Sequence, residues 1–214
     1  METQLIAALR ASDASTRLRA ALAIGSAPEP GLVDPLVARC AIEPDFSVRE
    51  MLTWALTRLP SEITVPKLLA ELNSEHAQAR SQALHTLSKI KDASAWPTIT
   101  PSLLRDPDDE VARSAWRAAV VLVPDARKKS LAEELATQLG RGERHVQLSL
   151  SRALVALGEE AIEPVLRKAI ASEDAGVHAH ASATQQLLHD PGAGFEPALD
   201  EAKRRFILGR EQEG

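Results

Sequence analysis

The fold of this chain is decided by residues 45–56, which read DFSVREMLTWAL. Shorter versions of this stretch return along the chain at a nearly constant spacing of about 31 to 34 residues. With Arg49 taken as position zero, the equivalent positions are Arg17, Arg49, Arg80, Arg113, Gln147 and His178. Such a spacing is typical of arrays of helical repeats, in which each repeat is a pair of helices packed on the next pair.

The amino-acid composition favours an all-α protein with a sizeable core. The 214 residues are 44% hydrophobic and 26% charged, a balance typical of globular chains. Ala and Leu supply much of the apolar share, whereas there are three Trp, three Phe and no Tyr, so residues that favour helices outnumber those that favour strands. The net charge of −5 predicts no broad attraction to nucleic acid or to an anionic membrane.

Cellular location is inferred from what the sequence lacks. The single Cys40 cannot form an internal disulfide, and the first residues lack the basic start and apolar core of a secretion signal. No apolar run approaches the roughly 18 residues of a membrane span. We therefore predict a cytoplasmic protein, and the Ala-rich and Arg-rich usage suits a bacterial source.

A second pattern lies about fourteen residues upstream of position zero in most repeats. It has the form apolar-x-Pro-x-apolar and contains Pro35, Pro66, Pro101 and Pro164. Proline fits the first turn of a helix, because its missing N–H would have no partner within the helix there. The pattern predicts that each repeat opens with a first helix that begins near its proline.

A short polar turn follows each first helix, and a second helix is expected to start at an acidic residue whose carboxylate accepts a free backbone N–H. These acidic residues are Asp13, Asp45, Asp109, Glu143 and Asp174. Within the second helix, apolar residues recur at positions −1, +3, +6, +7 and +10, which span about a third of the helix circumference. This stripe is the predicted core face, and in the fourth repeat it includes Trp116.

These patterns lay the chain out as one repeat domain, residues 1–214. The predicted helix pairs occupy residues 1–27, 28–60, 61–92, 93–125, 126–158 and 159–190. After a Pro- and Gly-containing break, another first-helix signature begins at Phe195. We predict that residues 195–209 form a capping helix, because the last pair of an array otherwise leaves its apolar face open.

The motif at residues 45–56 resembles that of the HEAT-repeat family, whose second helix carries Asp-x-x-Val-Arg followed by small and apolar residues. The resemblance covers nearly the whole chain and weakens where Gln147 and His178 replace the arginine. It implies a right-handed α-solenoid with the second helices on the concave side. It also implies a polar ladder between neighbouring repeats, interrupted after the fourth repeat. The ladder residues are Asp13, Arg17, Asp45, Arg49, Arg80, Asp109 and Arg113.

No residue pattern in the sequence indicates catalysis or metal binding. The metal-dependent hydroxylases among HEAT-like proteins use His-Glu pairs, but no His here is followed by Glu. His178 and His180 would be about 200° apart on a helix, and we interpret the histidines as solvated or ladder residues. Cys40 is a lone helical cysteine, most often a small buried residue. We predict a protein that is not an enzyme and binds no cofactor or metal.

Positions +1, +5 and +8 lie opposite the core stripe, so they would face the concave groove of a HEAT-like array. Apolar residues at such positions, rimmed by charge, are typical of partner sites, although packing on the neighbouring helix is an equal alternative for Trp54. The predicted groove residues are Glu50, Trp54, His85, Val121, Leu148 and Arg152 at these positions, together with Arg117, which also falls opposite the core stripe. We predict a scaffold that binds a segment of another protein there.

Two other functions stay open at this point. The resemblance includes bilin lyases, which implies an enzyme or lyase subunit with a small acidic or tetrapyrrole ligand in the same groove. The middle of the chain is also locally basic, as in nucleic-acid-binding relatives, although the net charge opposes this function. The basic residues are Arg113, Arg117, Arg127, Lys128, Lys129, Arg141, Arg144 and Arg152.

Overall fold

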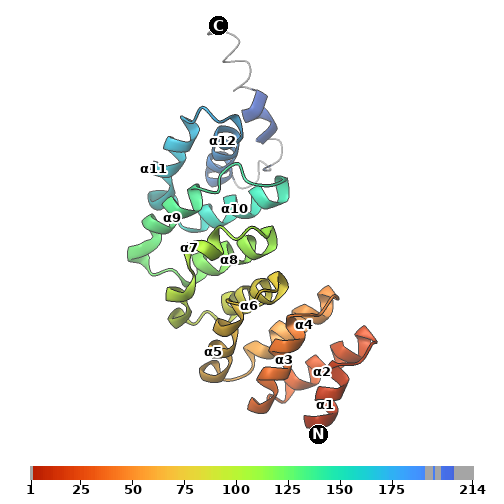
Figure 1. The fold of residues 1–214 in the computed structure, drawn as a ribbon. Helices are drawn as coiled ribbons and strands as arrows, with labels where there is room; N and C mark the ends of the chain where they lie inside the picture. Colours follow the sequence, from red (N-terminus) through yellow and green to blue (C-terminus); the bar gives the residue numbers. More distant parts are fainter. Residues whose placement is uncertain (1, 191–194, 196–198, 205–214) are drawn as a thin grey trace. The chain divides into compact units, whose positions relative to one another are not determined.

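The computed structural model describes residues 2–190, 195 and 199–204, and all regular structure in this part of the chain is helical (Figure 1). The α-helices are α1 (Glu2–Leu9), α2 (Ala14–Ser26), α3 (Val33–Cys40), α4 (Phe46–Thr57), α5 (Ser61–Glu71), α6 (Ala77–Ile90), α7 (Pro101–Leu104), α8 (Asp109–Leu122), α9 (Lys128–Ala136), α10 (Arg144–Ala156), α11 (Glu159–Ile170) and α12 (Ala175–His189). Short 3-10 turns precede α3, α7 and α9. None of the helices described is long and apolar enough to cross a membrane.

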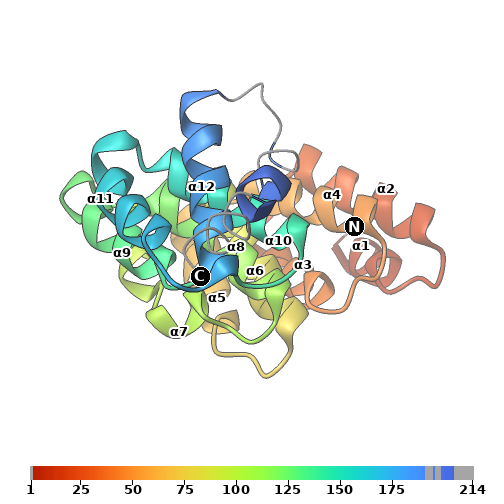
Figure 2. The same ribbon diagram turned by 90° about the horizontal axis from the view of Figure 1, so that it is seen from above.

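The chain divides into two compact units, Met1–Leu122 and Val123–Gly214. The first unit contains the pairs from α1/α2 to α7/α8, and the second contains α9/α10 and α11/α12; the two helices of each pair pack together. Figures 1 and 2 show the two helices of a pair next to each other, for example α3 with α4 and α11 with α12. The predicted all-α repeat fold with six helix pairs is confirmed, whereas the single domain and its repeat boundaries stay a prediction.

The prolines of the first helices do not all lie in the first turn. Pro101 is the first residue of α7, and Pro35 is near the start of α3, as predicted. Pro66 and Pro164 instead lie inside α5 and α11, each five residues after the first residue of its helix. The prediction that the helix begins near its proline is wrong for these two repeats, because one more turn forms upstream and the helix tolerates a single missing N–H bond.

Most of the second helices begin at the predicted acidic residues. Asp13, Asp45 and Asp174 accept hydrogen bonds from backbone N–H groups two or three residues further on, at 2.8–3.0 Å. Glu143 occupies the cap position of α10 without such a bond. In α8 the capping carboxylate belongs to Asp108, which accepts from the N–H groups two and three residues later at 2.9 and 3.1 Å, so the assignment of Asp109 as the cap was wrong by one residue.

The predicted core stripe is buried. In α4 and the turn after it, every stripe residue is less than a tenth exposed, and the same holds for the stripe of α10. Trp116 in α8 is fully buried and donates from Nε1 to the carbonyl oxygen of Leu104 at 2.8 Å. Val120, one stripe position of α8, is only half-buried. The periodicity therefore located the core correctly.

The buried arc of the second helices is wider than the stripe, because each of these helices also packs sideways on the next. In the first unit α2 packs on α4, α4 on α6 and α6 on α8; in the second, α10 packs on α12. Hydroxyl groups meet at these side contacts: Ser81 and Ser114 Oγ are 3.0 Å apart, and Ser151 Oγ and Thr184 Oγ1 are 2.7 Å apart. Several +1, +5 and +8 residues are therefore buried and do not line a groove: Gly25, Ser81, Ser88, Ser114 and Ala118. Ala179 and Ala183 are also buried, in a cluster with residues of the C-terminal segment.

A C-terminal segment packs against the first half and middle of α12 in the second unit. Phe195, Leu199 and Ala202 are buried in one cluster with Ala179 and Ala183 of α12. The capping helix at residues 195–209 stays a prediction, because residues 196–198 and 205–209 lie outside the described part of the chain.

Candidate protein-binding surface

In every repeat except the fourth, the side chain at position zero closes the turn that precedes its own helix. Arg17, Arg49 and Arg80 each donate through Nη1 to the carbonyl oxygens five and six residues earlier, at 2.7–3.2 Å. Gln147 donates through Nε2 to two carbonyl oxygens of its own turn at 3.0 and 3.5 Å, and His178 Nδ1 lies 2.6 Å from the carbonyl oxygen of Ile170. The backbone role of this position therefore persists where the residue type changes.

Ion pairs between repeats use acidic residues of the turns. Arg17 donates to both carboxylate oxygens of Glu43 at 2.7 Å, and Arg80 donates to both oxygens of Asp106 at 3.0 and 3.1 Å. Each acid lies in the turn after the first helix of the following repeat. The aspartates expected in the ladder cap helices instead, or adjoin the cap in the case of Asp109.

Two of the expected ladder arginines have other partners. The guanidinium of Arg49 lies over the ring of Phe46, 5.9 Å from its centre. Arg113 forms an ion pair with Glu110 on its own helix. Among the predicted ladder arginines, Arg17 and Arg80 therefore form the ion pairs to the next repeat. Their acidic partners, Glu43 and Asp106, lie before the recurrent motif and were not among the predicted ladder residues.

Glu43 is fully buried among several donors. Arg39 Nε lies 2.7 Å from its Oε2, and the backbone N–H of Asp45 donates to its Oε1 at 2.9 Å, in addition to the two bonds from Arg17. Burial by itself raises the pKa of Glu43, but the hydrogen bonds from Arg17, Asp45 and Arg39 outweigh it and lower the pKa to about 2. The site is thus a buried carboxylate that remains charged.

Three of the predicted groove residues form a polar row across α4, α6 and α8. Glu50 Oε1 lies 3.1 Å from His85 Nε2, and Arg117 Nη1 lies 3.3 Å from His85 Nδ1. Burial, followed by the charges of Arg117 and Lys89, lowers the pKa of His85 against the opposing effect of Glu50. The ring is therefore neutral near pH 7, and its Nδ1 accepts a hydrogen bond from Arg117.

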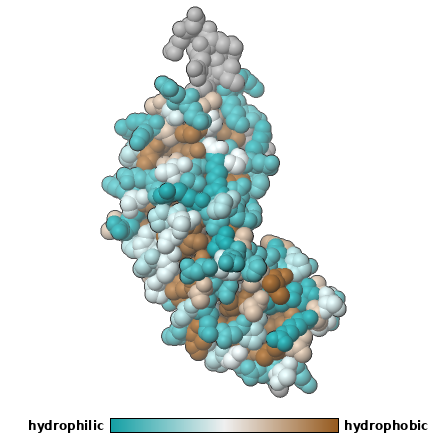
Figure 3. Space-filling view, in the orientation of Figure 1, coloured by the Kyte–Doolittle hydropathy of each residue, from teal (hydrophilic) through white to brown (hydrophobic). Residues whose placement is uncertain are grey.

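Exposed apolar residues lie one helical turn beyond this row. Trp54 follows Glu50 by four residues on α4, and Val121 follows Arg117 by four residues on α8; they are 38% and 42% exposed. The Trp54 ring also packs on α2 at Gly25, where an added Cβ would lie 2.2 Å from ring atom Cζ3. Trp54 thus combines contact with the neighbouring helix and an exposed face. Figure 3 shows apolar patches among hydrophilic ones on the visible face of the first unit.

The two groove residues of the second unit have different surroundings. Leu148 is partly buried, because it packs on the apolar cluster that α12 forms with Phe195 and Leu199 of the C-terminal segment. Its expected place in an open groove is therefore not what the structure shows. Arg152 is exposed.

Several basic residues of the second unit are paired with acids. Lys128 contacts Asp125 at 2.8 Å, Lys129 contacts Glu160 at 2.7 Å, and Arg144 contacts Asp200 at 2.8 Å. These pairs reduce the positive potential that the sequence indicated for the middle of the chain.

Two residues that are chemically reactive in other settings have structural positions here. His180, expected to be solvated or a ladder residue, is fully buried; its Nδ1 accepts from the N–H of Gly140 at 3.0 Å, and its Nε2 donates to the carbonyl oxygen of Gln147 at 2.9 Å. Burial lowers the pKa of His180 to about 4. Burial likewise raises the pKa of Cys40 to about 12. Within the described residues, no three His, Cys, Asp or Glu side chains gather as metal ligands.

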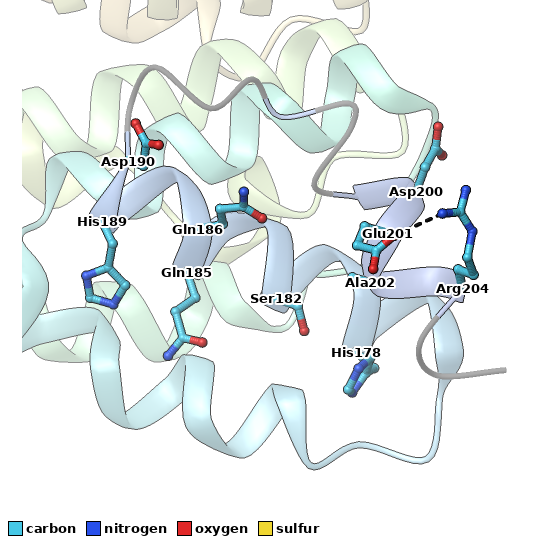
Figure 4. A pocket seen from close by; sticks show the side chains of 10 residues that line it. All are labelled: His178, Ser182, Gln185, Gln186, His189, Asp190, Asp200, Glu201, Ala202 and Arg204. Carbon is cyan, nitrogen blue, oxygen red and sulfur yellow. Dashed lines mark hydrogen bonds and ion pairs between the residues drawn. The ribbon is translucent and has the colours of Figure 1, made fainter. Parts of the chain in front are cut away.

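A cavity of about 970 Å³ lies in the second unit between α12 and the C-terminal segment (Figure 4). Its lining is mostly polar and charged, and Arg204 forms an ion pair with Glu201 at 3.1 Å along one wall. The lining residues are His178, Ser182, Gln185, Gln186, His189, Asp190, Asp200, Glu201, Ala202 and Arg204. The predicted groove residues are not among them.

The solved structures to which this chain is similar include the following three. The complex of CpcE and CpcF of the phycocyanin lyase from Nostoc sp. PCC7120 is 21% identical, with 98% of this chain and 88% of that chain covered and a TM-score of 0.50. An engineered protein is 19% identical over 89% of this chain and 98% of that chain, with a TM-score of 0.48. Human deoxyhypusine hydroxylase is 16% identical over 98% and 96%, with a TM-score of 0.47. At 21% identity, the likeness to the phycocyanin lyase complex shows a shared fold alone.

The sequence itself matches a known family. No curated protein matches the chain at a significant level. The model of HEAT repeats, however, matches residues 2–70 and 36–120, which together make up more than half of the chain. These residues contain the helix pairs of the first unit, with their turn-closing arginines and buried stripes, and the chain therefore belongs to the HEAT-repeat family.

Proposed function

We propose that this protein is a non-enzymatic scaffold, and that the exposed side of α4, α6 and α8 in the first unit binds a segment of another protein. Helical repeat arrays commonly present an extended surface to protein partners, and their fold alone specifies no reaction. A cytoplasmic location, as expected from the sequence, is part of this proposal.

The observation that carries the proposal is the polar row of Glu50, His85 and Arg117 beside exposed Trp54 and Val121. Trp and Arg are the residue types most enriched among those that dominate binding energies at protein interfaces. The row connects the second helices of three successive repeats, α4, α6 and α8, so its side chains are held in place before a partner binds. Less conformational entropy is therefore lost on binding.

Binding of nucleic acid has less support than binding of protein. Lys128, Lys129 and Arg144 are already paired with acids, and the whole chain carries a net charge of −5. A surface that attracts phosphates through released counterions needs several unpaired cations along one face. Beside the polar row, the exposed side chains of Trp54 and Val121 add apolar surface next to the charge of Arg117.

A comparative pull-down from cells of the source organism tests the proposal. The bait is the wild-type chain or the double variant Trp54→Ala, Arg117→Glu. The control is Ile63→Ala, Arg10→Glu. It changes an apolar side chain of similar exposure, at 39%, on the first helix α5, and an exposed arginine directly after the first helix α1. Circular dichroism first establishes that the three proteins are equally folded.

We expect the wild type and the control to retain the same proteins and the Trp54→Ala, Arg117→Glu variant to lose at least one of them. If all three baits retain identical partners, the assignment of the surface is wrong. If the control variant loses partners and the Trp54→Ala, Arg117→Glu variant does not, the binding surface lies on the first helices instead.

A further inference from the structure

The charge of Arg117 is not matched by a carboxylate in the way that the charges of Arg17, Arg80 and Arg113 are matched. Arg17 is paired with Glu43, Arg80 with Asp106 and Arg113 with Glu110. The polar contact found for the Arg117 side chain among the described residues is the one to His85 Nδ1 at 3.3 Å. A guanidinium has five N–H donors, so most of its donors remain available to a ligand.

His85 positions Arg117 without neutralising it. The charged groups that act on the His85 ring are Glu50, Arg117 and Lys89, and burial is the largest effect on its pKa. The neutral ring takes the hydrogen bond from Arg117 on Nδ1 and turns Nε2 toward Glu50. The carboxylate of Glu50 and the guanidinium of Arg117 therefore lie at opposite edges of one ring, and the ring separates the two charges.

The register of α6 and α8 places a second cation beside the apolar residues. Ser81 pairs with Ser114, and His85 pairs with Arg117 one turn later, so the two helices run in the same direction. One turn further, Lys89 on α6 and Val121 on α8 are both exposed. A rise of about 6 Å per four residues thus separates the polar row from a row that contains Trp54, Lys89 and Val121.

We propose, resting on the function proposed above, that the partner segment presents an acidic side chain to Arg117, with an apolar side chain next to it that contacts Trp54 or Val121. A carboxylate can accept two parallel hydrogen bonds from a guanidinium, and Lys89 adds a favourable charge nearby. Glu50 already contacts His85, so its carboxylate is less available than Arg117 to bind an oppositely charged side chain of the partner.

Selection from a displayed library of random 12-residue peptides on the wild-type chain tests this inference. The strongest peptide is then synthesised twice, with its acidic residue intact and with that residue exchanged for its amide. Dissociation constants of both peptides are measured on the wild type, on Arg117→Gln, on Trp54→Ala and on the control Arg10→Gln. Arg117→Gln keeps a side chain of polar character while removing the charge.

We expect the selected peptides to combine Asp or Glu with a neighbouring apolar residue. The amide peptide should bind the wild type about tenfold more weakly than the acidic peptide, and the two peptides should bind Arg117→Gln equally. Trp54→Ala should weaken both peptides, and Arg10→Gln should bind like the wild type. If the amide peptide binds more weakly than the acidic peptide by the same factor on the wild type and on Arg117→Gln, the inference is wrong.

The outcomes separate this inference from the proposed function. Peptides that require Trp54 but bind equally well as acid and amide, or that carry basic residues in place of acidic ones, contradict the acidic anchor and leave the binding surface in place. Selected peptides that are indifferent to both Trp54→Ala and Arg117→Gln contradict the acidic anchor and the surface together.

Discussion

Exchange of Glu43 for Gln should destabilise the first unit more than any change of an exposed ion pair. Glu43 is fully buried and accepts hydrogen bonds from Arg17, Arg39 and the N–H of Asp45. Gln has a nearly identical shape, but its amide turns a donor toward Arg17 and removes the charge. Arg17, only 5% exposed, is then left as a buried cation without a counter-charge.

Two routes give a similar magnitude. Removal of one partner of a buried ion pair destabilises proteins by about 3–5 kcal/mol. The pKa of Glu43, lowered from 4.5 to about 2, corresponds to about 3 kcal/mol of folding free energy. Because the folded-state pKa lies below the unfolded-state value, this contribution is present above about pH 4.5 and is lost as the pH falls toward 2.

Urea unfolding followed by tryptophan fluorescence measures this effect in the first unit, because all three tryptophans, Trp54, Trp96 and Trp116, lie before residue 123. Asp34→Asn is the control, since it breaks the exposed pair with Lys67 and should change stability by less than about 1 kcal/mol. We expect Glu43→Gln to lower the free energy of unfolding by about 3 kcal/mol at pH 7, and by much less at pH 2.5. A loss below about 1 kcal/mol at pH 7, or a loss of equal size at both pH values, would refute the electrostatic account.

Three further predictions concern buried groups. The pKa of His180 is lowered to about 4, below its unfolded-state value near 6.5. The free energy of unfolding of the second unit should therefore fall by about 3 kcal/mol as the pH falls from 6.5 to 4. Hydrogen exchange of α10 and α12 should show this loss in the wild type and not in His180→Gln. Trp116→Phe should cost about 2–4 kcal/mol, because it leaves a cavity and deprives the carbonyl of Leu104 of its bond; equal unfolding midpoints by circular dichroism would contradict this. Cys40 is buried, and its pKa is raised to about 12. An aromatic disulfide reagent at pH 8 should therefore label the thiol only at the rate at which the protein unfolds. Fast labelling under native conditions would show instead that the thiol is accessible.

Much of the fold could be predicted from the sequence, because repetition displays the same pattern several times. The stripe that includes Val48, Leu52 and Leu56 is buried as expected, since a period of 3.6 residues leaves few alternatives for an amphipathic helix. The prolines were less informative. A proline is tolerated a turn inside a helix as well as at its start, so Pro66 and Pro164 could not mark the first residue of α5 and α11.

The site was harder to predict because its contacts depend on the register between helices. Periodicity assigns Glu50, His85 and Arg117 to exposed faces, but it does not indicate that one imidazole joins the other two side chains. The same limit explains Glu43, whose buried pairing with Arg17 bridges 26 residues of sequence. Burial of flank residues such as Ser114 follows from side-to-side packing of second helices, which no single-helix pattern contains.

The contact between Trp54 and Gly25 links the evolution of two positions in adjacent repeats. Glycine inside a helix is less favourable than alanine by about 0.5–1 kcal/mol, and Gly25 lies in the second-to-last position of α2. With the indole in its present place, any side chain at residue 25 would overlap the ring. Among orthologues, we therefore expect alanine or larger residues at this position to accompany a smaller residue at position 54. Sequences that keep the indole should keep the glycine as well.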